Sequence, residues 1–240
     1  MRSTYLFLIS SSLVVLSAPL YADDFTVSST SSSTNGGHTV IGSDNLTVTS
    51  AGSISPVNAH GISTTGGSNT ITVEGSITTL NGHSGIQSTN ESGNQITLSG
   101  SAHITSTSNG AQGTGINIGG GSGGNNNSIT LSDSAKITTI GNSGIGISIF
   151  GDNNTVTLSK GTEISTSGTS ADGIYVYDGS GNTINVAGKI KATNTDAKAL
   201  HLEGGANGVV NFQEGALIIG PIHTDNDYAT GSILNIDVGL

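Results

Sequence analysis

A short run of alternating apolar and polar residues recurs along most of the chain. It reads "NTITVEGSITT" at 69–79, "NQITLSGSAHITS" at 94–106, "NSITLSDSAKITT" at 127–139 and "NTVTLSKGTEIST" at 154–166. Apolar residues two positions apart are the pattern of a strand with one buried face, and Ile, Val and Thr favour extended backbone. The repeat therefore predicts short strands separated by turns, with helix disfavoured almost everywhere.

Each repeat contains three apolar anchor positions. The first anchors are Leu46, Ile71, Ile96, Ile129, Val156, Ile184 and Val209, at intervals of 25, 25, 33, 27, 28 and 25 residues. The second anchors follow six or eight residues later, at Ile54, Ile77, Ile104, Ile137, Ile164, Ile190 and Leu217. A third strand begins at a small-residue step, at Gly61-Ile62, Gly85-Ile86, Gly115-Ile116, Gly144-Ile145, Gly173-Ile174 and Ala199-Leu200. Because successive strand residues point to opposite faces, the even spacing predicts that the first and second anchors face the same way.

A turn-forming residue stands two positions before each first anchor. These residues are Asp44, Asn69, Asn94, Asn127, Asn154, Asn182 and Asn207. Asn and Asp favour turns because their side chains bond to the nearby backbone, and stacked Asn side chains form ladders of hydrogen bonds. We therefore predict that these seven residues form a structural turn ladder along the stack.

Repetition of one three-strand unit predicts a right-handed parallel β-helix of about seven coils. A single coil cannot bury its apolar row alone, so the coils stack to complete a core. With strands about 4.8 Å apart, seven coils would make a rod roughly 35 Å long. A β-sandwich is the alternative all-β fold, but its irregular connections do not predict one unit repeated in the same order.

The two ends of the chain depart from the repeat. Residues 1–22 combine one basic residue, an apolar stretch and small residues at the end, which is the pattern of a secretory signal peptide. Residues 23–43 are predicted to form an irregular capping coil, in which Phe25 and Val27 cover the end of the solenoid. Residues 44–240 are the predicted β-helix, which is expected to be truncated at its C-terminus because no polar capping segment follows.

Composition narrows the classes of partner. Cysteine is absent, 9% of the residues are charged and 33% are hydrophobic. After removal of the signal peptide, the chain has five lysines against 16 acidic residues, a formal charge of −11. Binding of phosphate backbones needs clustered Lys or Arg, and no stretch provides such a cluster, so nucleic acid is not an expected partner.

Candidate catalytic groups are scattered along the coils. Glycoside hydrolysis needs two carboxylates that flank the scissile bond, but no "DD" or "DxD" pair falls within the coils, and no arginine follows the signal peptide. The stretch "YDGSGNT" at 177–183 contains letters of a serine-protease motif in another order. A nucleophilic serine needs a base and an orienting acid, and no histidine stands nearby in the sequence. We therefore predict that the chain is not an enzyme and that this stretch is a turn.

The sequence gives equally little support for a metal site or a cofactor site. "GDNN" at 151–154 could offer oxygen ligands to a cation, but the nonapeptide period of calcium-binding repeats is absent. His60 and His83 both stand just before a third-strand glycine and would lie on adjacent coils. Two imidazoles without a third ligand make a poor zinc site, so we interpret them as exposed loop residues. No metal ligand and no cofactor are predicted.

Rows of threonine suggest ice binding as a further candidate function, because outward threonine ladders occur on β-solenoids that bind ice. "ITT" recurs at 77–79 and at 137–139. The corresponding positions elsewhere include Pro56 and Lys191, which would interrupt a flat threonine face. Ordinary β-propensity already favours threonine in strands, so ice binding is not the expected function.

The chain resembles the passenger region of a bacterial autotransporter of type V secretion. The resemblance rests on the signal peptide, the absence of cysteine and the Gly/Ser/Thr/Asn-rich coils with "NxITL…G…I" repeats, and it covers residues 23–240. It implies export across the inner membrane and display as a rod on a Gram-negative cell. It also implies an outer-membrane translocator barrel as a partner, whose alternating strands of about 10 residues are not evident after residue 207.

These observations predict a non-enzymatic surface or secreted protein that acts in adhesion, aggregation or virulence. The expected location is the periplasm, the cell surface or the medium, with outer-membrane association if a translocator is supplied. A host surface and like molecules on neighbouring cells are the expected targets. Two alternatives stay open: an inactive remnant of a truncated autotransporter gene, and a degenerate β-helical enzyme that acts on polysaccharides.

Overall fold

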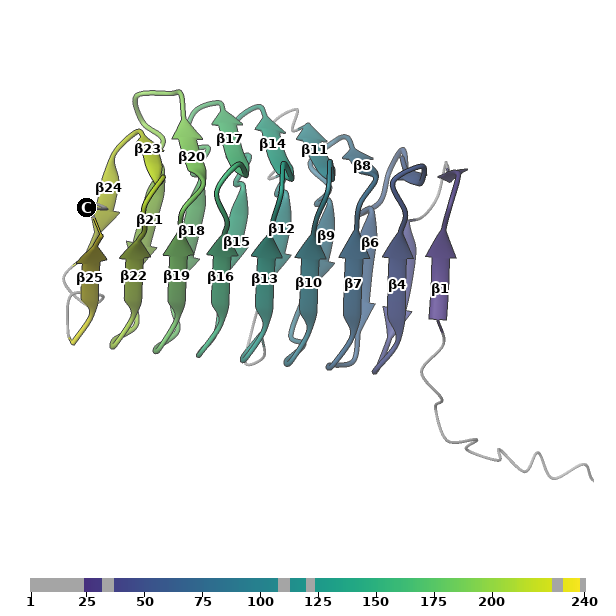
Figure 1. Cartoon of the computed structure of the whole chain (residues 1–240), viewed down its shortest axis with the longest axis horizontal. Coiled ribbons are helices and arrows are strands. Elements are labelled where there is room, and N and C mark those ends of the chain that lie inside the picture. The colour runs from purple at the N-terminus through teal and green to yellow at the C-terminus, as the bar shows by residue number, and fades with distance from the viewer. Residues whose placement is uncertain (1–23, 32–36, 108–112, 120–123, 226–230, 238–240) are drawn as a thin grey trace, which may run out of the picture.

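The computed structural model describes residues 24–31, 37–107, 113–119, 124–225 and 231–237. Every regular element in these residues is a β-strand. The strands stack side by side along one axis and form a rod (Figure 1). The prediction of an all-β parallel β-helix with about seven coils is therefore confirmed.

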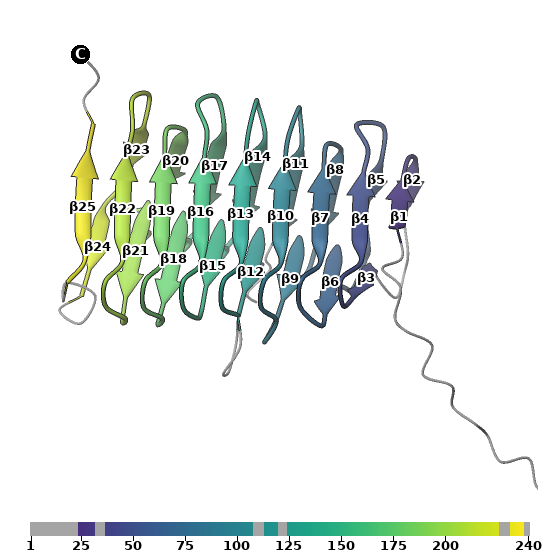
Figure 2. The same ribbon diagram turned by 60° about the horizontal axis from the view of Figure 1, so that its bottom comes forward.

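Three parallel sheets run along the rod, and successive strands of a coil enter different sheets (Figure 2). Sheet A contains β1 (Asp24–Val27), β4 (Asn45–Val48), β7 (Thr70–Val73), β10 (Gln95–Leu98), β13 (Ser128–Leu131), β16 (Thr155–Leu158), β19 (Thr183–Val186), β22 (Val209–Phe212) and β25 (Ile233–Ile236). Sheet B contains β2 (Thr30–Ser31), β5 (Ser53–Ile54), β8 (Ser76–Thr79), β11 (His103–Thr107), β14 (Lys136–Ile140), β17 (Glu163–Ser167), β20 (Lys189–Ala192) and β23 (Leu217–Ile219). Sheet C contains β3 (His38–Ile41), β6 (Ile62–Thr65), β9 (Ile86–Ser88), β12 (Ile116–Ile118), β15 (Ile147–Ile149), β18 (Ile174–Tyr177), β21 (Leu200–Glu203) and β24 (Ile222–Thr224).

The apolar anchors form columns inside the rod. Ile71 pairs in register with Leu46 on one side and with Ile96 on the other, and Ile104 pairs with Ile77. Each of these side chains is buried. Full burial of such a side chain stabilises a fold by roughly 1.5–3 kcal/mol, so the stacked columns provide the main driving force for joining one coil to the next.

The predicted positions of the first and second anchors in the last coil are wrong by one residue. Val210 pairs with Ile184, where the sequence analysis placed Val209. Ile218, rather than Leu217, takes the second inward position. The sequence offers consecutive apolar residues at both places, and a slip of one residue turns each side chain to the opposite face.

The third strand of one coil, β15, begins two residues later than predicted. Ile147 pairs with Ile116, so the small-residue step is Gly146-Ile147 and not Gly144-Ile145. The sequence reads "GIGI" at 144–147. The pattern therefore fits both steps, and only the pairing with the neighbouring coil distinguishes them.

In the coils of β6, β9, β12, β15 and β18, glycine precedes the third strand because the corner between sheets B and C has no room for a side chain there, whereas Ala199 takes this position before β21. A Cβ added to Gly115 would lie 2.3 Å from Cγ2 of Ile137 and 2.5 Å from the carbonyl oxygen of Gly146. Gly85 and Gly173 meet the same two kinds of neighbour. The repeated Gly-Ile step thus determines how closely the coils approach each other at this corner.

Buried hydroxyl groups satisfy carbonyl groups at the same corner. Thr139 Oγ1 donates to the carbonyl oxygen of Gly144, and Thr166 Oγ1 donates to that of Ala171. Both threonine side chains are fully buried. Because a buried carbonyl without a donor is costly, these inward-facing threonines allow the turn to leave the regular hydrogen bonding of the sheet.

Strands β1–β3 precede the seven predicted coils and pair in parallel with β4–β6. Phe25 aligns with Leu46, and Val27 aligns with Val48. Val27 is buried, whereas Phe25 is half exposed. The predicted signal peptide, 1–22, lies outside the described residues. In the part of the chain that the structure describes, no helix has the length and hydrophobicity needed to cross a membrane.

Candidate functional site

Five of the predicted ladder residues form a continuous asparagine column at the turn into sheet A. The side-chain carbonyl of each accepts a hydrogen bond from the backbone N–H of the ladder residue one coil earlier. The first step, from Asp44 to Asn69, is 3.2 Å long. Each later step is 2.8 Å long, through Asn94, Asn127 and Asn154 to Asn182. The five asparagines are buried, so the column joins coils and offers no surface to a ligand.

Asn207 does not take the next place in the asparagine column. The strand register puts Gly208 opposite Asn182, and the backbone N–H of Gly208 donates to the hydroxyl of Ser232 at 3.1 Å. Asn207 has a φ of +57°, a left-handed conformation that Asn adopts more readily than most residues. The prediction for Asn207 is wrong for the same reason as that for Val209, because the repeat slips by one residue here.

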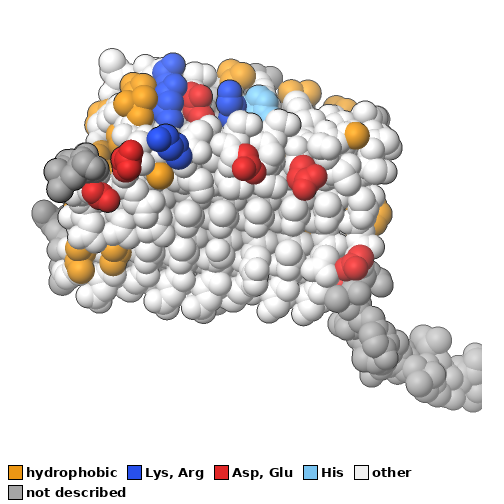
Figure 3. Space-filling model, in the orientation of Figure 1, with side chains coloured by type: hydrophobic (Ala, Val, Ile, Leu, Met, Phe, Trp, Pro, Cys, Tyr) orange, Lys and Arg blue, Asp and Glu red, His pale blue; other side chains and the backbone are white. Residues whose placement is uncertain are grey.

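The face shown in Figure 3 carries mainly uncharged polar side chains, with charged ones gathered along one side. Lys136, Glu163 and Lys189 form one row on β14, β17 and β20 of sheet B. Nζ of Lys189 lies 2.9 Å from Oε1 of Glu163, a partly exposed ion pair of the kind that is worth about 0–1 kcal/mol. The row alternates in sign, so it offers no patch of a single charge to a partner.

Threonine lines sheet A more regularly than sheet B, a row that the sequence analysis missed. Members of this outward row pair in register and are Thr26, Thr47, Thr72, Thr97, Thr130 and Thr157. The row then gives way to Asn185, Asn211 and Asn235. In the "ITT" sequences of sheet B, the second threonine faces inward and is buried. Neither sheet therefore carries a uniform threonine face along the whole rod.

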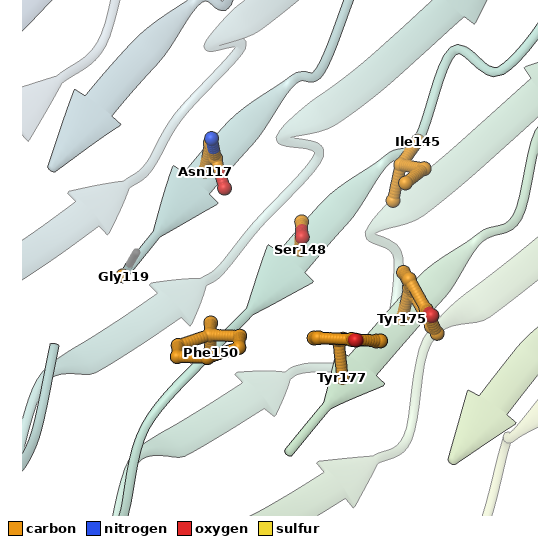
Figure 4. A pocket seen from close by; sticks show the side chains of 7 residues that line it. All are labelled: Asn117, Gly119, Ile145, Ser148, Phe150, Tyr175 and Tyr177. Atoms are coloured by element: carbon orange, nitrogen blue, oxygen red, sulfur yellow. The ribbon is translucent and has the colours of Figure 1, made fainter. Parts of the chain in front are cut away.

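The outer face of sheet C differs from the other two because large rings replace small polar residues. A hollow of about 370 Å³ lies over β12, β15 and β18 (Figure 4). Its lining residues are Asn117, Gly119, Ile145, Ser148, Phe150, Tyr175 and Tyr177. We call this feature the aromatic hollow. Asn117, Ser148 and Tyr175 form one outward row across the three strands, so the pairing of the coils brings these residues together.

Gly119 keeps the aromatic hollow open beside Phe150. A Cβ at Gly119 would lie 1.9 Å from the carbonyl oxygen of Phe150 and 2.8 Å from its Cβ. The φ of Gly119 is +97°, in a region that glycine adopts without steric cost. The backbone conformation and the close contact both require glycine at this position.

A chain of ring contacts extends from the aromatic hollow toward the last coils. Phe150 and Tyr177 have centroids 5.4 Å apart and planes 22° apart, and Figure 4 shows the two rings next to each other. Tyr175 contacts Tyr177 at 5.8 Å and stacks on His201 at 4.6 Å, and His201 contacts His223 edge-on at 5.1 Å. These separations are typical of favourable aromatic pairs. Tyr177 is 48% exposed, which leaves part of its ring accessible to a ligand.

A hydrogen-bonded network holds Tyr175 at the edge of the aromatic hollow. Its hydroxyl donates to Oε2 of Glu203 at 2.5 Å. Burial and this hydrogen bond raise the pKa of Tyr175 above its usual range, so the hydroxyl stays protonated. Nδ1 of His201 lies 2.6 Å from Oδ2 of Asp172, and Oδ1 of Asp172 accepts from the backbone N–H of Lys198 at 2.7 Å. The Asp172 carboxylate therefore fixes the His201 ring that stacks on Tyr175.

Sequence reasoning assigned no residue of the aromatic hollow to a functional site. One signal was present, because Tyr175 in "GIYVY" occupies an outward position where most other third strands carry Ser, Gln or Asn, and Tyr177 places a second ring two residues later. The rings come from successive coils and are far apart in sequence, so they looked scattered. Only the pairing of Ser148 with Tyr175 shows that they share one surface.

His60 and His83 lie on adjacent coils, as their positions in the repeat predict. Their ring centroids are 5.2 Å apart and their planes are nearly perpendicular. The two side chains are half-buried, so the interpretation as exposed loop residues is wrong. The backbone N–H of Ser84 donates to Nδ1 of His60 at 2.9 Å. Burial and, to a smaller extent, the neighbouring His83 lower the pKa of His60.

The lowered pKa of His60 predicts that the fold loses stability in acid. The folded chain binds fewer protons at this base than the unfolded chain, so its contribution is complete above about pH 6.5 and is lost as the pH falls further. His60→Asn removes the titration and still offers an acceptor to Ser84. Circular dichroism should show a smaller drop in Tm for His60→Asn than for the unaltered chain between about pH 7.5 and about pH 5. An equal drop, or the same rescue by His223→Asn at an exposed site, would contradict this assignment.

The other two motifs of the sequence analysis lie in stacked turns between sheets C and A. "GDNN" at 151–154 precedes β16, and "YDGSGNT" at 177–183 runs from the last residue of β18 to the first residue of β19. Oδ1 of Asp152 accepts from the backbone N–H of Ser180 at 2.7 Å, so a carboxylate of the first turn holds the second. Among the residues described, no group of three or more His, Asp or Glu side chains is placed to hold a metal ion.

The aromatic hollow offers ring faces, an amide and a hydroxyl to a ligand, and none of its lining residues is charged. Such a set of groups binds and orients an uncharged molecule more readily than it transfers protons. In comparisons with known proteins, no family model, curated protein or solved structure matches the chain significantly.

Proposed function

We propose that this chain is a non-enzymatic exported protein that acts in adhesion or self-association at the surface of a Gram-negative cell, or after release. It would reach that surface as a passenger of the autotransporter type, with an outer-membrane translocator as its partner. The observation that carries the proposal is the aromatic hollow on the outside of the rod. Exposed aromatic residues that gather on one surface are typical of interaction sites.

The architecture of the rod supports this role. In a solenoid each coil contacts only its neighbours, so inward residues hold the scaffold while outward residues are free to differ. The asparagine column and the isoleucine columns follow the repeat, whereas Phe150, Tyr175 and Tyr177 depart from it. Because these rings lie on an outer face, where the repeat does not require them, recognition of a ligand gives them a function.

A second candidate function is that of a β-helical enzyme that acts on polysaccharides. One observation favours it, because the carboxylates of Asp172 and Glu203 lie 2.6 Å and 3.9 Å from the two ring nitrogens of His201. However, both oxygens of Asp172 already have partners in the fold, and Glu203 accepts the hydroxyl of Tyr175. This bonding favours positioning of the Tyr175 ring over acid–base catalysis.

Binding and cleavage measurements separate the two candidates. The full chain, labelled with a fluorophore, is expected to bind cells in flow cytometry or to cluster with itself in light scattering. It is expected to release no oligosaccharide from a panel of polysaccharides analysed by chromatography. Phe25→Ala, which removes an exposed ring on β1 far along the rod from the hollow, serves as a control that should bind normally. Release of oligosaccharides would favour the enzyme, and a chain that binds neither cells nor itself would contradict the proposed function.

A further inference from the structure

We propose that the aromatic hollow binds a saccharide of pyranose rings that carries no negative charge. The inference rests on the proposed surface function and adds to it the chemical class of the ligand. It depends on three properties of the hollow, which are the arrangement of its rings, its hydrogen-bonding groups and the charge around its rim.

The rings offer flat faces of the kind on which a sugar stacks. Phe150 and Tyr177 lie with planes 22° apart, and Tyr175 adjoins Tyr177 at 5.8 Å. The face of an aromatic ring carries negative potential, which attracts the polarised C–H groups on the flat side of a pyranose. A saccharide combines such a C–H face with a rim of hydroxyl groups, and the hollow provides partners for both.

The polar lining has hydrogen-bonding capacity that the fold does not use. The hydroxyl of Ser148 makes no hydrogen bond with any residue in the described part of the chain. Nδ2 of Asn117 donates to Oε1 of Gln87 at 3.1 Å, which orients the amide and leaves its carbonyl oxygen for a ligand. Ser148 lies at the centre of the hollow in Figure 4, between Asn117 and the tyrosines. Sugar hydroxyls both donate and accept, so they suit this mixed set.

The charge around the aromatic hollow selects against acidic sugars. Exposed Asp178 follows Tyr177 in the chain, and Glu203 pairs with Tyr177 across the strands. Lys198, which stands two residues before β21, has its Nζ 2.9 Å from the carbonyl oxygen of Asp196. Acidic groups repel uronic acids and sulfated sugars but tolerate neutral sugars and attract amino sugars, which also gain from cation–π contact.

The size of the aromatic hollow limits what it holds. Its volume of about 370 Å³ is at the lower end of the roughly 300–1,000 Å³ that is usual for ligand sites. We therefore expect it to hold a short stretch of a longer saccharide, with the remaining sugar units in solvent.

Calorimetric titration of the full chain with three hexasaccharides tests the inference. The probes are the hexamers of N-acetylglucosamine, of glucosamine and of galacturonic acid, which are neutral, amine-bearing and acidic. The neutral and the amine-bearing hexamers are expected to bind, and the acidic hexamer at least about tenfold more weakly. Phe150→Ala and Tyr177→Ala should each weaken binding about tenfold. Tyr177→Phe, which keeps the ring, and Phe25→Ala, which removes a remote ring, should change it less than about twofold.

Three results would overturn the inference. They are a failure of both non-acidic hexamers to bind, equal binding of the acidic hexamer, and unchanged affinity in Phe150→Ala and Tyr177→Ala. The Tm of each variant should stay within a few degrees of that of the unaltered chain, so that lost binding reports the rings and not the fold. If a variant that combines Phe150→Ala and Tyr177→Ala still adheres to cells as the unaltered chain does, the saccharide site is wrong while the proposed surface function stands.

Discussion

Replacing Asn127 by alanine is expected to lower the free energy of unfolding by about 3 kcal/mol. The change removes the acceptor of the buried backbone N–H of Asn94. It also removes the donor to the carbonyl oxygen of Glu91 and to Oδ1 of Asn154. A buried donor without a partner costs about 1–3 kcal/mol by itself. Thermal unfolding followed by circular dichroism should show a Tm lower by about 6–12 °C.

Two further variants separate hydrogen bonding from shape. Asn127→Asp keeps an acceptor for Asn94 but places a carboxylate against Oδ1 of Asn154. Burial beside that oxygen would raise the pKa of the new carboxyl group, so its destabilising effect should grow as the pH rises and shrink as the group is protonated. Asn45→Ala, on the outer face of sheet A, should change stability by less than about 0.5 kcal/mol. If Asn127→Ala loses no more stability than Asn45→Ala, the asparagine column does not hold the coils together.

Substitution of Gly115 by alanine is expected to have a similarly large effect, about 3 kcal/mol. The added methyl group would overlap Cγ2 of Ile137 and the carbonyl oxygen of Gly146, at 2.3 Å and 2.5 Å. The isoleucine can change rotamer, but the carbonyl belongs to the backbone of the next coil. Relief of the overlap would therefore separate two coils at the corner between sheets B and C. Urea unfolding should show the loss as a lower midpoint.

Thr130→Ala is the matched control for the glycine corner. Thr130 lies on β13, in the coil that follows Gly115, but faces outward. Its removal should cost less than about 0.5 kcal/mol. A free energy of unfolding for Gly115→Ala equal to that of the control would show that the corner has room for a side chain, contrary to the contacts in the structure.

The scaffold could be predicted from the sequence because its rules repeat. The isoleucine columns, the glycine corner and five asparagines of the ladder all follow from positions that recur in each coil. Prediction failed where the chain offers two equivalent choices. "VV" at 209–210 and "GIGI" at 144–147 each fit the strand pattern in two ways, and hydrogen bonding to the neighbouring coil decides between them.

The aromatic hollow could not be predicted from the repeat because its residues occupy the positions that the repeat leaves free. Phe150 and Tyr177 belong to different coils, and nothing in their local sequence shows that they are neighbours. Gly119 has no side chain and so leaves space beside Phe150, a feature that no pattern of apolar residues reveals. The positions of aromatic residues on the outer face of sheet C indicate a shared site only after the register of its strands is known.

The points at which a saccharide touches the rod can be mapped residue by residue. We expect that titration of the uniformly ¹⁵N-labelled full chain with the hexamer of N-acetylglucosamine will shift the amide resonances of Asn117, Ser148 and Tyr177 in ¹H–¹⁵N correlation spectra. The amide of Thr130 on sheet A should not move. Shifts centred on sheet A, or no shifts under conditions in which the hexamer is in large excess, would contradict the claim that the outer face of sheet C is the binding surface of this rod.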